Sequence, residues 1–358
     1  MEKKNVVQNI FNCPICPYFG RNSISNSFIS ILDQCRIHPA ILRLGMRMKD
    51  RKIVGTNMRS KCLLIAIGQM LEDYYCPPYK SIEKHLKMVL DTHISYITSQ
   101  RQHNIAMGNV IKWLKKQICK INPSLPPNEI INQLISSIKT YIYQRIVNAC
   151  ERISYVISNK YIIDGDVIVT YSNSSSVIKS LFKAVEMNKS FQLIVVDSKN
   201  NIDSSSQDIA KKLSLKGIKI TYTLLNCLAY HLRYATKVII GSCAIFSNGY
   251  VMNRSGSSLV AMLAKIHHIP VMIVSESYKL CEKNYFEHST VFNEVVEQKI
   301  SDNLVYTSEN SEESLPNSQT IAFIPCYDVI PPRFIDAIVT EDGIFSAESF
   351  SIQNKVAN

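Results

Sequence analysis

The sequence predicts an α/β protein, with an N-terminal all-α helical domain followed by a Rossmann-like open parallel sheet that has helices on both faces. Two patterns carry this prediction. Up to about residue 160, apolar residues recur at spacings of three and four, which is the period of a helix with one buried face. Beyond that point, short β-branched runs alternate with helical segments, as in the βαβ units of a parallel sheet.

The chain is long enough for more than one domain. It has 358 residues, of which 46% are apolar and 19% are charged, a composition typical of folded, core-forming proteins. We predict a polar, partly disordered arm at residues 1–36, the helical domain at 37–160 and the α/β domain at 161–358. An acidic, Ser-rich loop is expected within the last of these, at about 300–319.

The apolar spacing justifies each helical segment of the first domain. In two of them the repeating positions are Leu63, Ile67, Met70, Leu71 and Tyr74, then Ile82, Leu86, Val89, His93 and Ile97. Prolines in residues 77–78 and 123–127 interrupt the pattern. Asn128 is then placed to cap a long helix that continues through Val147.

Five buried-strand segments predict the sheet of the second domain. They are residues 166–170, 191–196, 218–221, 238–240 and 270–274. Gly165 and Gly217 precede the first and third of them, as glycines of αβ loops do. After the acidic loop, residues 322–332 are expected to be extended, and the apolar spacing of residues 334–339 predicts a final short helix.

The positive charge is concentrated in the first domain. Residues 1–160 hold 23 Lys and Arg against 9 Asp and Glu, a net of +14, whereas residues 161–358 hold 17 against 20, a net of −3. A basic domain indicates either an acidic or phosphorylated partner or solvated helix faces, and charge alone does not choose between them. No basic-aromatic stripe or nucleic-acid motif accompanies it, so RNA gains no support as the partner.

Compartment and cofactors follow from what the sequence lacks. No apolar run approaches the roughly 20 residues that cross a bilayer. Eleven cysteines scattered singly suit a reducing compartment, so we predict a cytosolic protein. Cys13 and Cys16 have the spacing of zinc ligands, but no second pair completes a tetrahedral site. Phosphate-loop, dinucleotide-binding and Gly-x-Ser-x-Gly patterns are absent too, so we expect neither metal nor cofactor.

The most informative segment is residues 237–256, where a buried strand ends in a long polar turn. Open parallel sheets bind ligands beyond the carboxyl ends of their strands. The strand-end residues expected to line one crevice are therefore Ser172, Asp197, Cys243, Ser275 and Glu276. Where a reacting site would need a carboxylate, this strand is followed by Ser242 and Cys243. The architecture of an enzyme pocket is therefore predicted without the matching chemistry.

A hydroxyl-rich turn follows the first predicted strand and includes Asn173 and Ser174. Backbone amides at the start of a helix can hold a phosphate, and the same residues serve equally well as helix caps. The turn is thus either part of a sugar-phosphate or nucleotide pocket, or a packed and vestigial crevice.

With these segments identified, the chain resembles the regulatory subunits of eukaryotic translation initiation factor 2B, a family that includes sugar-phosphate isomerases acting on methylthioribose or ribose phosphates. The resemblance covers about residues 10–345. The segments that carry it are 38–45, 166–176, 195–198, 241–256 and 269–279. Three further segments are similar to the delta type in particular, namely 72–78, 106–112 and 327–341.

The isomerases of this family place a catalytic Cys after the first strand and a catalytic Asp in a Gly-Ala-Asp turn. The matching positions here hold Ser172 and Cys243, so the resemblance implies a chain without the isomerase's proton-transfer groups. A phosphorylated ligand is still conceivable, although the turn expected to contain an arginine reads Asp-Ser-Lys. The candidate ligand residues are Asn173, Ser174, Asp197, Lys199, Asn248, Asn253, Arg254 and Gly256.

The function implied by the resemblance is that of a non-catalytic, delta-like regulatory subunit. It would belong to the guanine-nucleotide exchange factor for the initiation factor that carries initiator tRNA, with exchange residing in the epsilon subunit. The implied partners are the homologous alpha and beta subunits, the gamma and epsilon subunits, and the phosphorylated alpha subunit of the initiation factor, contacted by the helical domain. Neither a membrane nor direct nucleic-acid binding is implied.

Some choices stay open on the sequence alone. The beta subunit is expected to pair with the strand-end loops and residues 328–341. The phosphorylated partner would meet some of Arg43, Arg47, Arg51, Lys84, Lys87 and Arg101, without a preference among them. The alternatives to a regulatory subunit are an active aldose–ketose isomerase of the ribose-phosphate type and a stand-alone phosphate-binding module.

Overall fold

The computed structural model describes residues 37–78, 80–122, 124–198, 206–286, 295–299 and 321–347. The chain divides into two compact units, Met1–Pro39 and Ala40–Asn358, and the second contains both the helices and the sheets that follow. The predicted arm, the Cys13–Cys16 pair and the acidic loop lie outside the described residues, as does Lys199.

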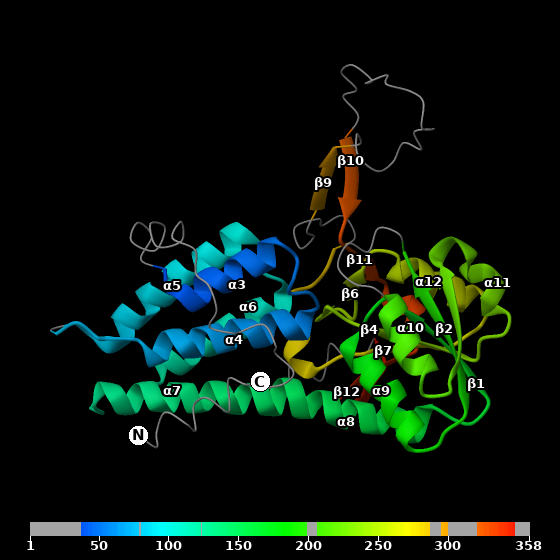
Figure 1. The fold of residues 1–358 in the computed structure, drawn as a ribbon, viewed down its shortest axis with the longest axis horizontal. Coiled ribbons are helices and arrows are strands. Elements are labelled where there is room, and N and C mark those ends of the chain that lie inside the picture. The colour runs from blue at the N-terminus through cyan, green and yellow to red at the C-terminus, as the bar shows by residue number, and fades with distance from the viewer. Residues whose placement is uncertain are drawn as a thin grey trace. The chain divides into compact units, whose positions relative to one another are not determined.

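The N-terminal part of the second unit is helical, as the apolar spacing predicts (Figure 1). The helices are α3 (Pro39–Lys49), α4 (Thr56–Glu72), α5 (Ile82–Gln100), α6 (Ile105–Cys119) and α7 (Pro127–Tyr141). Helix α4 packs against α6 and α7, and α5 packs against α6. Their buried side chains are those of the predicted apolar positions, such as Leu63, Ile67 and Leu86.

Residues 127–161 form one continuous helix that links the helical part to the sheet. It runs from α7 through the π-helical segment η1 (Ile142–Asn148), α8 (Ala149–Val156) and a second π-helical segment, η2 (Ile157–Tyr161). The predicted Asn128 cap is wrong, because Pro126 is the residue before the helix and Pro127 is its first residue. Proline suits that position, where its missing N–H would have no partner in the helix.

The α/β part is built on a seven-stranded sheet with the order β13-β12-β7-β4-β1-β2-β3. Its strands are β1 (Asp166–Tyr171), β2 (Phe191–Asp197), β3 (Lys219–Leu224), β4 (Lys237–Gly241), β7 (Val271–Val274), β12 (Ala337–Thr340) and β13 (Gly343–Phe345). All neighbours are parallel except β12 and β13. The predicted fold class is therefore confirmed.

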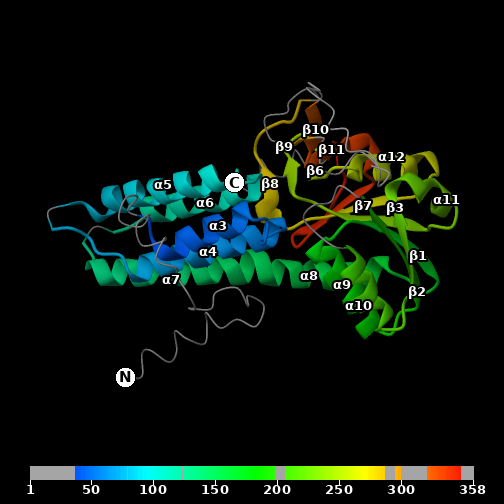
Figure 2. The same ribbon diagram turned by 45° about the horizontal axis from the view of Figure 1, so that its top comes forward.

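Helices cover both faces of this sheet (Figures 1 and 2). On one face lie α8, α9 (Ser175–Glu186) and α10 (Ser206–Ser214), packed on strand residues such as Ile168 and Ile239. On the other lie α11 (Leu228–Leu232) and α12 (Ser257–Ile266), packed on the alternate positions, such as Val169 and Ile240. This alternation of buried residues explains why the strands read as unbroken apolar runs.

A smaller sheet, β11-β6-β5-β8, adjoins the carboxyl ends of the large one. Its strands are β5 (Ala244–Phe246), β6 (Val251–Arg254), β8 (Leu280–Cys281) and β11 (Tyr327–Ile330), with a hairpin of β9 (Val295–Lys299) and β10 (Ile321–Pro325) beside it in Figure 1. Short 3₁₀ turns, η3 (Leu225–Cys227), η4 (Ser277–Lys279) and η6 (Pro332–Phe334), connect elements.

The predicted final helix is wrong. Residues 332–334 form only the turn η6, and residues 337–340 form strand β12 beside β7. Ile338 is buried on one face of the sheet and Val339 on the other, so this short segment is apolar on both sides. A short, fully buried strand cannot be told from a helix by periodicity.

No helix among the described residues is both long enough and apolar enough to span a membrane.

Candidate functional site

A cavity of about 70 Å³ lies at the carboxyl ends of β1 and β4. These two strands are the neighbours at which the strand order reverses, the position where open α/β sheets bind ligands. Ser172 follows β1 and Cys243 follows β4, and both line the cavity. The structure thus brings the two strand-end residues together, and the volume suffices for several water molecules or a small anionic group.

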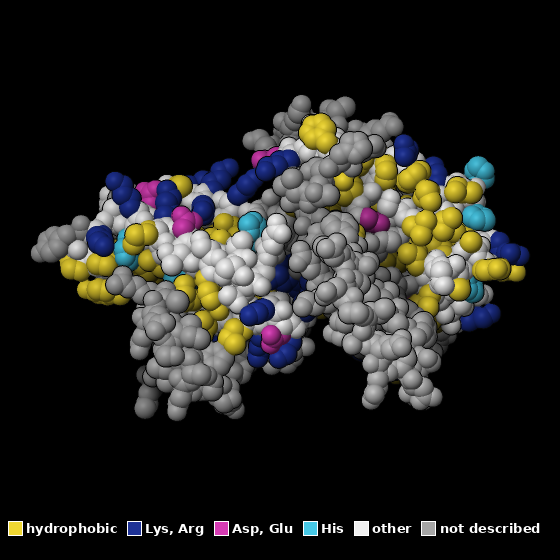
Figure 3. Space-filling view, turned by 90° about the horizontal axis from the view of Figure 1, so that it is seen from above, with side chains coloured by type: hydrophobic (Ala, Val, Ile, Leu, Met, Phe, Trp, Pro, Cys, Tyr) yellow, Lys and Arg dark blue, Asp and Glu magenta, His cyan; other side chains and the backbone are white. Residues whose placement is uncertain are grey.

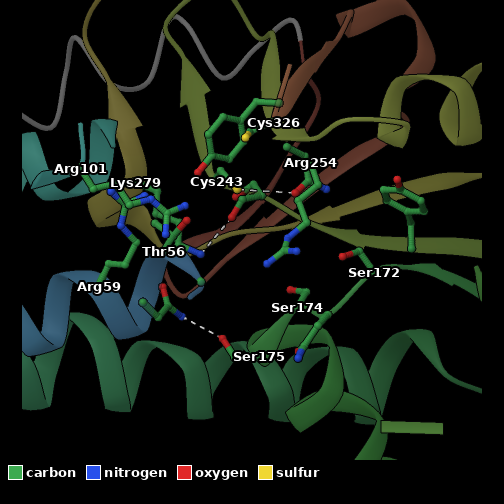
Figure 4. A pocket seen from close by; sticks show the side chains of 17 residues that line it. Thr56, Arg59, Arg101, Ser172, Ser174, Ser175, Cys243, Arg254, Lys279 and Cys326 are labelled. Carbon is green, nitrogen blue, oxygen red and sulfur yellow. Dashed lines mark hydrogen bonds between the residues drawn. The ribbon is translucent and has the colours of Figure 1, made fainter. Parts of the chain in front are cut away.

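Four cations line this cavity. Arg59 and Arg101 come from the helical part, Arg254 ends β6, and Lys279 ends η4 (Figure 4). Three of them are deeply buried, with exposed fractions of 1% for Arg59, 7% for Arg101 and 4% for Lys279. None of the described lining residues is Asp, Glu or His. The electrostatic field in the cavity therefore favours an anion.

Ser172 occupies an unusual position in the cavity wall. Its φ of 56° lies in the left-handed region, which costs a non-glycine residue on the order of 1–3 kcal/mol. Its N–H donates a hydrogen bond to the carbonyl of Val196 at 2.9 Å. The residue is buried, with an exposed fraction of 5%. Among the described residues, the Ser172 hydroxyl has no hydrogen-bond partner. A buried hydroxyl in this state is available to a ligand.

Beneath the cavity lies a buried ion pair between Glu276 and Lys279. The Lys279 ammonium is 2.6 Å from Glu276 Oε2 and also donates to the carbonyl of Ser242 at 3.1 Å. The other carboxylate oxygen, Oε1, accepts hydrogen bonds from Ser176 Oγ and Asn57 Nδ2, both at 2.6 Å. Burial by itself raises the pKa of Glu276, but Lys279 and these two donors outweigh it and lower the pKa below its usual value.

This ion pair joins the helical part to the sheet. Asn57 lies in the first turn of α4, and its side-chain oxygen Oδ1 also accepts a hydrogen bond from the Tyr278 hydroxyl at 2.7 Å. Asn109 on α6 donates to the carbonyls of Tyr278 and Leu280 at 2.9 and 2.6 Å. Ser275 and Glu276 are fully buried and do not line the cavity, so the prediction that they would join the crevice is wrong. The contacts of Glu276 are those of a structural junction.

Cys243 presents a thiol rather than a carboxylate to the cavity. Its Sγ lies 3.7 Å from Asn253 Oδ1, and Asn253 is itself 7% exposed on β6. Asn253 thus lines the cavity together with Asn173, Ser174 and Arg254, so four of the eight candidate ligand residues lie there, beside the strand-end residues Ser172 and Cys243. Figure 4 places Ser172, Ser174 and Arg254 on one side and Arg59, Arg101 and Lys279 on the other.

Two further candidate ligand residues, Asp197 and Asn248, do not line the cavity and make hydrogen bonds to neighbouring groups instead. Asp197, at the end of β2, accepts hydrogen bonds from the backbone of Ser198 at 2.8 Å and the hydroxyl of Tyr222 at 3.3 Å. Asn248 makes two hydrogen bonds to the backbone of Tyr285, at 2.7 and 3.1 Å. Both hold local turns.

Gly256 does not line the cavity either, although it is close to it. It adopts a φ of 100° before α12, and a Cβ at this position would lie 2.4 Å from the Tyr171 hydroxyl. Its N–H donates to Asp328 Oδ2 at 2.8 Å, and Asp328 also binds the backbone of Ser258 at 3.0 Å. Gly256 is needed for the sharp turn from β6 into α12.

The sequence prediction missed the helical wall of the cavity. Arg101 was a candidate for the surface contacted by a phosphorylated partner, but it is buried here. Arg59 is spaced four residues before Leu63 and eight before Ile67, so it falls on the buried stripe of α4. A cation on an apolar stripe is the signal that would have identified it.

Comparisons with known proteins agree with the fold. A family model described as the initiation factor 2 subunit family matches residues 54–347. The chain is 34% identical to translation initiation factor eIF2B subunit delta of Schizosaccharomyces pombe, over 87% of this chain and 67% of that protein. It is 33% identical to the corresponding subunit of Dictyostelium discoideum, over 88% of this chain and 51% of that protein. It thus spans about half to two thirds of these relatives.

Two other matches bear on the site. The chain is 32% identical to the ribose 1,5-bisphosphate isomerase of Pyrococcus furiosus, over 85% of this chain and 90% of that enzyme. A chain in the crystal structure of the tetrameric eIF2B-beta2-delta2 complex from Chaetomium thermophilum has a TM-score of 0.74 and 28% identity, covering 85% of this chain and 92% of that one. Similarity therefore extends both to regulatory subunits and to enzymes.

Proposed function

The chain belongs to the initiation factor 2 subunit family, and we propose that it is a non-catalytic, delta-type regulatory subunit of the guanine-nucleotide exchange factor for the initiation factor that carries initiator tRNA. The observation that carries the proposal is the likeness to delta subunits over more than four fifths of this chain. The fold neighbour from a beta2-delta2 complex supports it independently.

The proposed partners follow from this role. The alpha and beta regulatory subunits and the gamma and epsilon subunits would share one cytosolic assembly with this chain. The helical domain, proposed to span residues 37–160, would contact the alpha subunit of the initiation factor, and more strongly in its phosphorylated form. The net charge of +14 in residues 1–160 supports a phosphorylated partner, because Lys and Arg form charge-assisted hydrogen bonds to phosphate.

The chemistry of the cavity supports a non-catalytic role. An aldose–ketose isomerase moves a proton between adjacent carbons, which needs a group that exchanges protons near neutral pH. The described walls offer arginines, the Lys279 ammonium, hydroxyls, amides and thiols, and no carboxylate or imidazole. Glu276 and Lys279 are the nearest ionisable pair, but each is engaged by the other and by fixed hydrogen bonds. The competing function, an isomerase, is favoured by the Pyrococcus furiosus relative.

One pair of experiments separates these functions. Affinity purification of the tagged chain from its own cells, followed by mass spectrometry, should recover the other four exchange-factor subunits. The purified chain should not convert ribose 1,5-bisphosphate above the rate of a buffer blank. Turnover that is lost on Cys243→Ala, without the other subunits in the purification, would instead establish the isomerase.

The cavity also supports ligand binding without catalysis, and we propose that it holds a phosphorylated small molecule. This second proposal is carried by the buried arginines and by the hydroxyl of Ser172, which has no hydrogen-bond partner within the described part of the chain. Ribose 5-phosphate should raise the melting temperature of the wild-type chain and have little effect on Arg254→Met. Arg233→Met, at an exposed cation on the α11 side of the sheet, is the matched control and should respond like wild type. An equal shift in all three proteins would disprove the site.

A further inference from the structure

The cavity lies at the seam between the helical part and the seven-stranded sheet. One wall comes from the start of α4 and the residue after α5, with Thr56, Arg59 and Arg101 (Figure 4). The opposite wall comes from the strand ends, with Ser172 after β1 and Arg254 at the end of β6. A molecule bound in this cavity therefore contacts both parts of the chain at once.

Two helices begin at this cavity, one from each part. Helix α4 follows Gly55 and α9 follows Ser174; neither of these residues caps its helix with a side chain, and neither helix has Asp or Glu in its first turn. The first N–H groups of a helix have no partner inside it and carry a partial positive charge. Asn57 Nδ2 donates a hydrogen bond to Ser175 Oγ at 3.2 Å, so the two helix starts are in contact. An anion in the cavity is attracted by both.

The carboxylate of Glu276 shows how a negative charge joins the two parts. It accepts hydrogen bonds from Asn57 and Ser176, which lie in the first turns of α4 and α9. Glu276 lies beneath the cavity, and within the cavity the buried Ser172 hydroxyl has no hydrogen-bond partner in the described part of the chain. A phosphate monoester offers three acceptor oxygens and a charge of about −1.5 to −2. The cavity is therefore suited to a second anion that would join the same two helix starts from above.

The seam depends strongly on hydrogen bonds. Within the described part of the chain, the apolar clusters on the two faces of the seven-stranded sheet contain no residue of α3–α7. Ile105, at the start of α6, packs on the cluster of the smaller sheet. The chain passes from the helical part to the sheet through η1, and π-helical segments of this kind are frequent at functional sites. A ligand that bridges such a polar seam has a large effect on how firmly the two parts are joined.

We propose that the cavity is an effector site, in which a phosphorylated small molecule holds the helical part against the sheet. The inference rests on the proposed function and adds a regulatory role to the phosphate site. The same helical part is proposed to contact the phosphorylated alpha subunit of the initiation factor. Filling the cavity should strengthen that contact, because a surface held in one arrangement loses less conformational entropy on binding.

The first test is hydrogen–deuterium exchange of the full chain with ribose 5-phosphate, inorganic phosphate or ribose. Both phosphates should slow amide exchange by about threefold or more in residues 55–60 and 101–105, because exchange follows local opening, and ribose should not. Arg101→Met, which removes a cation of the helical wall, should abolish the slowing in residues 101–105. Lys116→Met, at an exposed cation on α6, is the matched control and should respond like wild type. The wild-type comparison stands even if Arg101→Met does not fold.

The second test measures binding of the phosphorylated alpha subunit by biolayer interferometry. Affinity should rise by about fivefold or more when ribose 5-phosphate is present, and the alpha subunit should raise the affinity for ribose 5-phosphate by the same factor. A ligand that raises the melting temperature but changes neither exchange nor partner affinity would overturn the effector role and leave the proposed function and the phosphate site standing. Equal slowing of exchange by ribose would overturn phosphate as the recognised group. Absence of partner binding by the wild-type chain would overturn the proposed function together with the coupling that rests on it.

Discussion

The cavity and the outer surface of α11 and α12 are both built on the same seven-stranded sheet, yet they break opposite rules of protein stability. We call this surface the α11–α12 face; its exposed members are Tyr230, Tyr234, Leu259, Met262 and Ile266. The cavity buries Arg59, Arg101 and Lys279, although desolvating a charge is costly. The α11–α12 face exposes Tyr230 and Ile266, and Figure 3 shows hydrophobic side chains gathered over these helices, although exposing apolar area is costly too. Neither feature stabilises an isolated domain. The comparison teaches that departures from stable packing, rather than the packing itself, mark the places where a bound molecule would stabilise this chain.

The largest change in stability is expected from a substitution in the ion pair beneath the cavity, and it would sharpen this comparison. Glu276→Gln leaves the Lys279 ammonium buried without its counter-charge, which should lower the free energy of unfolding by about 3–5 kcal/mol at neutral pH. Urea denaturation measures it. Glu186→Gln is the control: Glu186 pairs with Lys183 at 3.0 Å with a 65% exposed side chain, so its loss should cost less than about 1 kcal/mol.

The difference in unfolding free energy between wild type and Glu276→Gln should depend on pH, with a sign set by the pKa of Glu276. The pKa of Glu276 is lowered on folding, so its contribution is present above the pKa of the unfolded chain and is lost as the pH falls through the folded pKa. The stability gap between wild type and Glu276→Gln should therefore be widest near neutral pH and shrink in acid, below about pH 4. A gap that widens on acidification would contradict the assigned ion pair.

The next effect concerns Gly256, the turn between the cavity wall on β6 and the apolar helix α12. Gly256→Ala places a Cβ 2.4 Å from the Tyr171 hydroxyl at a φ of 100°, so the free energy of unfolding should fall by about 2–3 kcal/mol. Gly68→Ala is the matched control in α4, where no atom lies within 4 Å of the new Cβ. It should be stabilising by up to about 1 kcal/mol in thermal or urea denaturation.

A smaller effect is expected at Asn57, which joins the helical part to the cavity floor. Asn57→Ala removes hydrogen bonds to Glu276 and Tyr278 and should cost about 1–3 kcal/mol in urea denaturation, because a buried carboxylate loses one donor. Asn122→Ala, at an exposed residue that binds the backbone of Ser124, should change little. Equal losses of unfolding free energy in the two variants would show that the hydrogen bonds of Asn57 stabilise the chain no more than that of the exposed Asn122.

The smallest effect should come from the α11–α12 face. Ile266→Ser changes a side chain that is 63% exposed, so the free energy of unfolding of the free chain should change by no more than about 0.5 kcal/mol. Val260→Ser, six residues earlier on the buried side of the same helix, should cost several times more. Comparable losses by differential scanning calorimetry would mean that Ile266 packs within this chain, and the contrast between the two regions would disappear.

Much of the fold could be read from local pattern. The helical periods, the five predicted strands and the glycines before β1 and β3 agree with the structure, with φ of 84° at Gly165 and 86° at Gly217. The family resemblance predicted from short segments is confirmed by the family match and the delta relatives. The failures were β12, a strand taken for a helix because both its sides are buried, and the cap of α7. The expected polar turn after β4 also contains two strands, β5 and β6.

By itself, the sequence determined that a helical part precedes the parallel strands β1, β2, β3, β4 and β7, and it placed Ser172 and Cys243 at strand ends. Local pattern suffices for this, because helix and strand periods are set by neighbours a few residues apart. Only the tertiary structure decided that Arg59 and Arg101 complete the cavity opposite Ser172, and that Asp197 turns away from it. It also decided that the apolar residues of α12 form two opposite sides, one buried and one exposed. Contacts between residues that are distant in the sequence leave no local period, so they emerge only when the chain has packed.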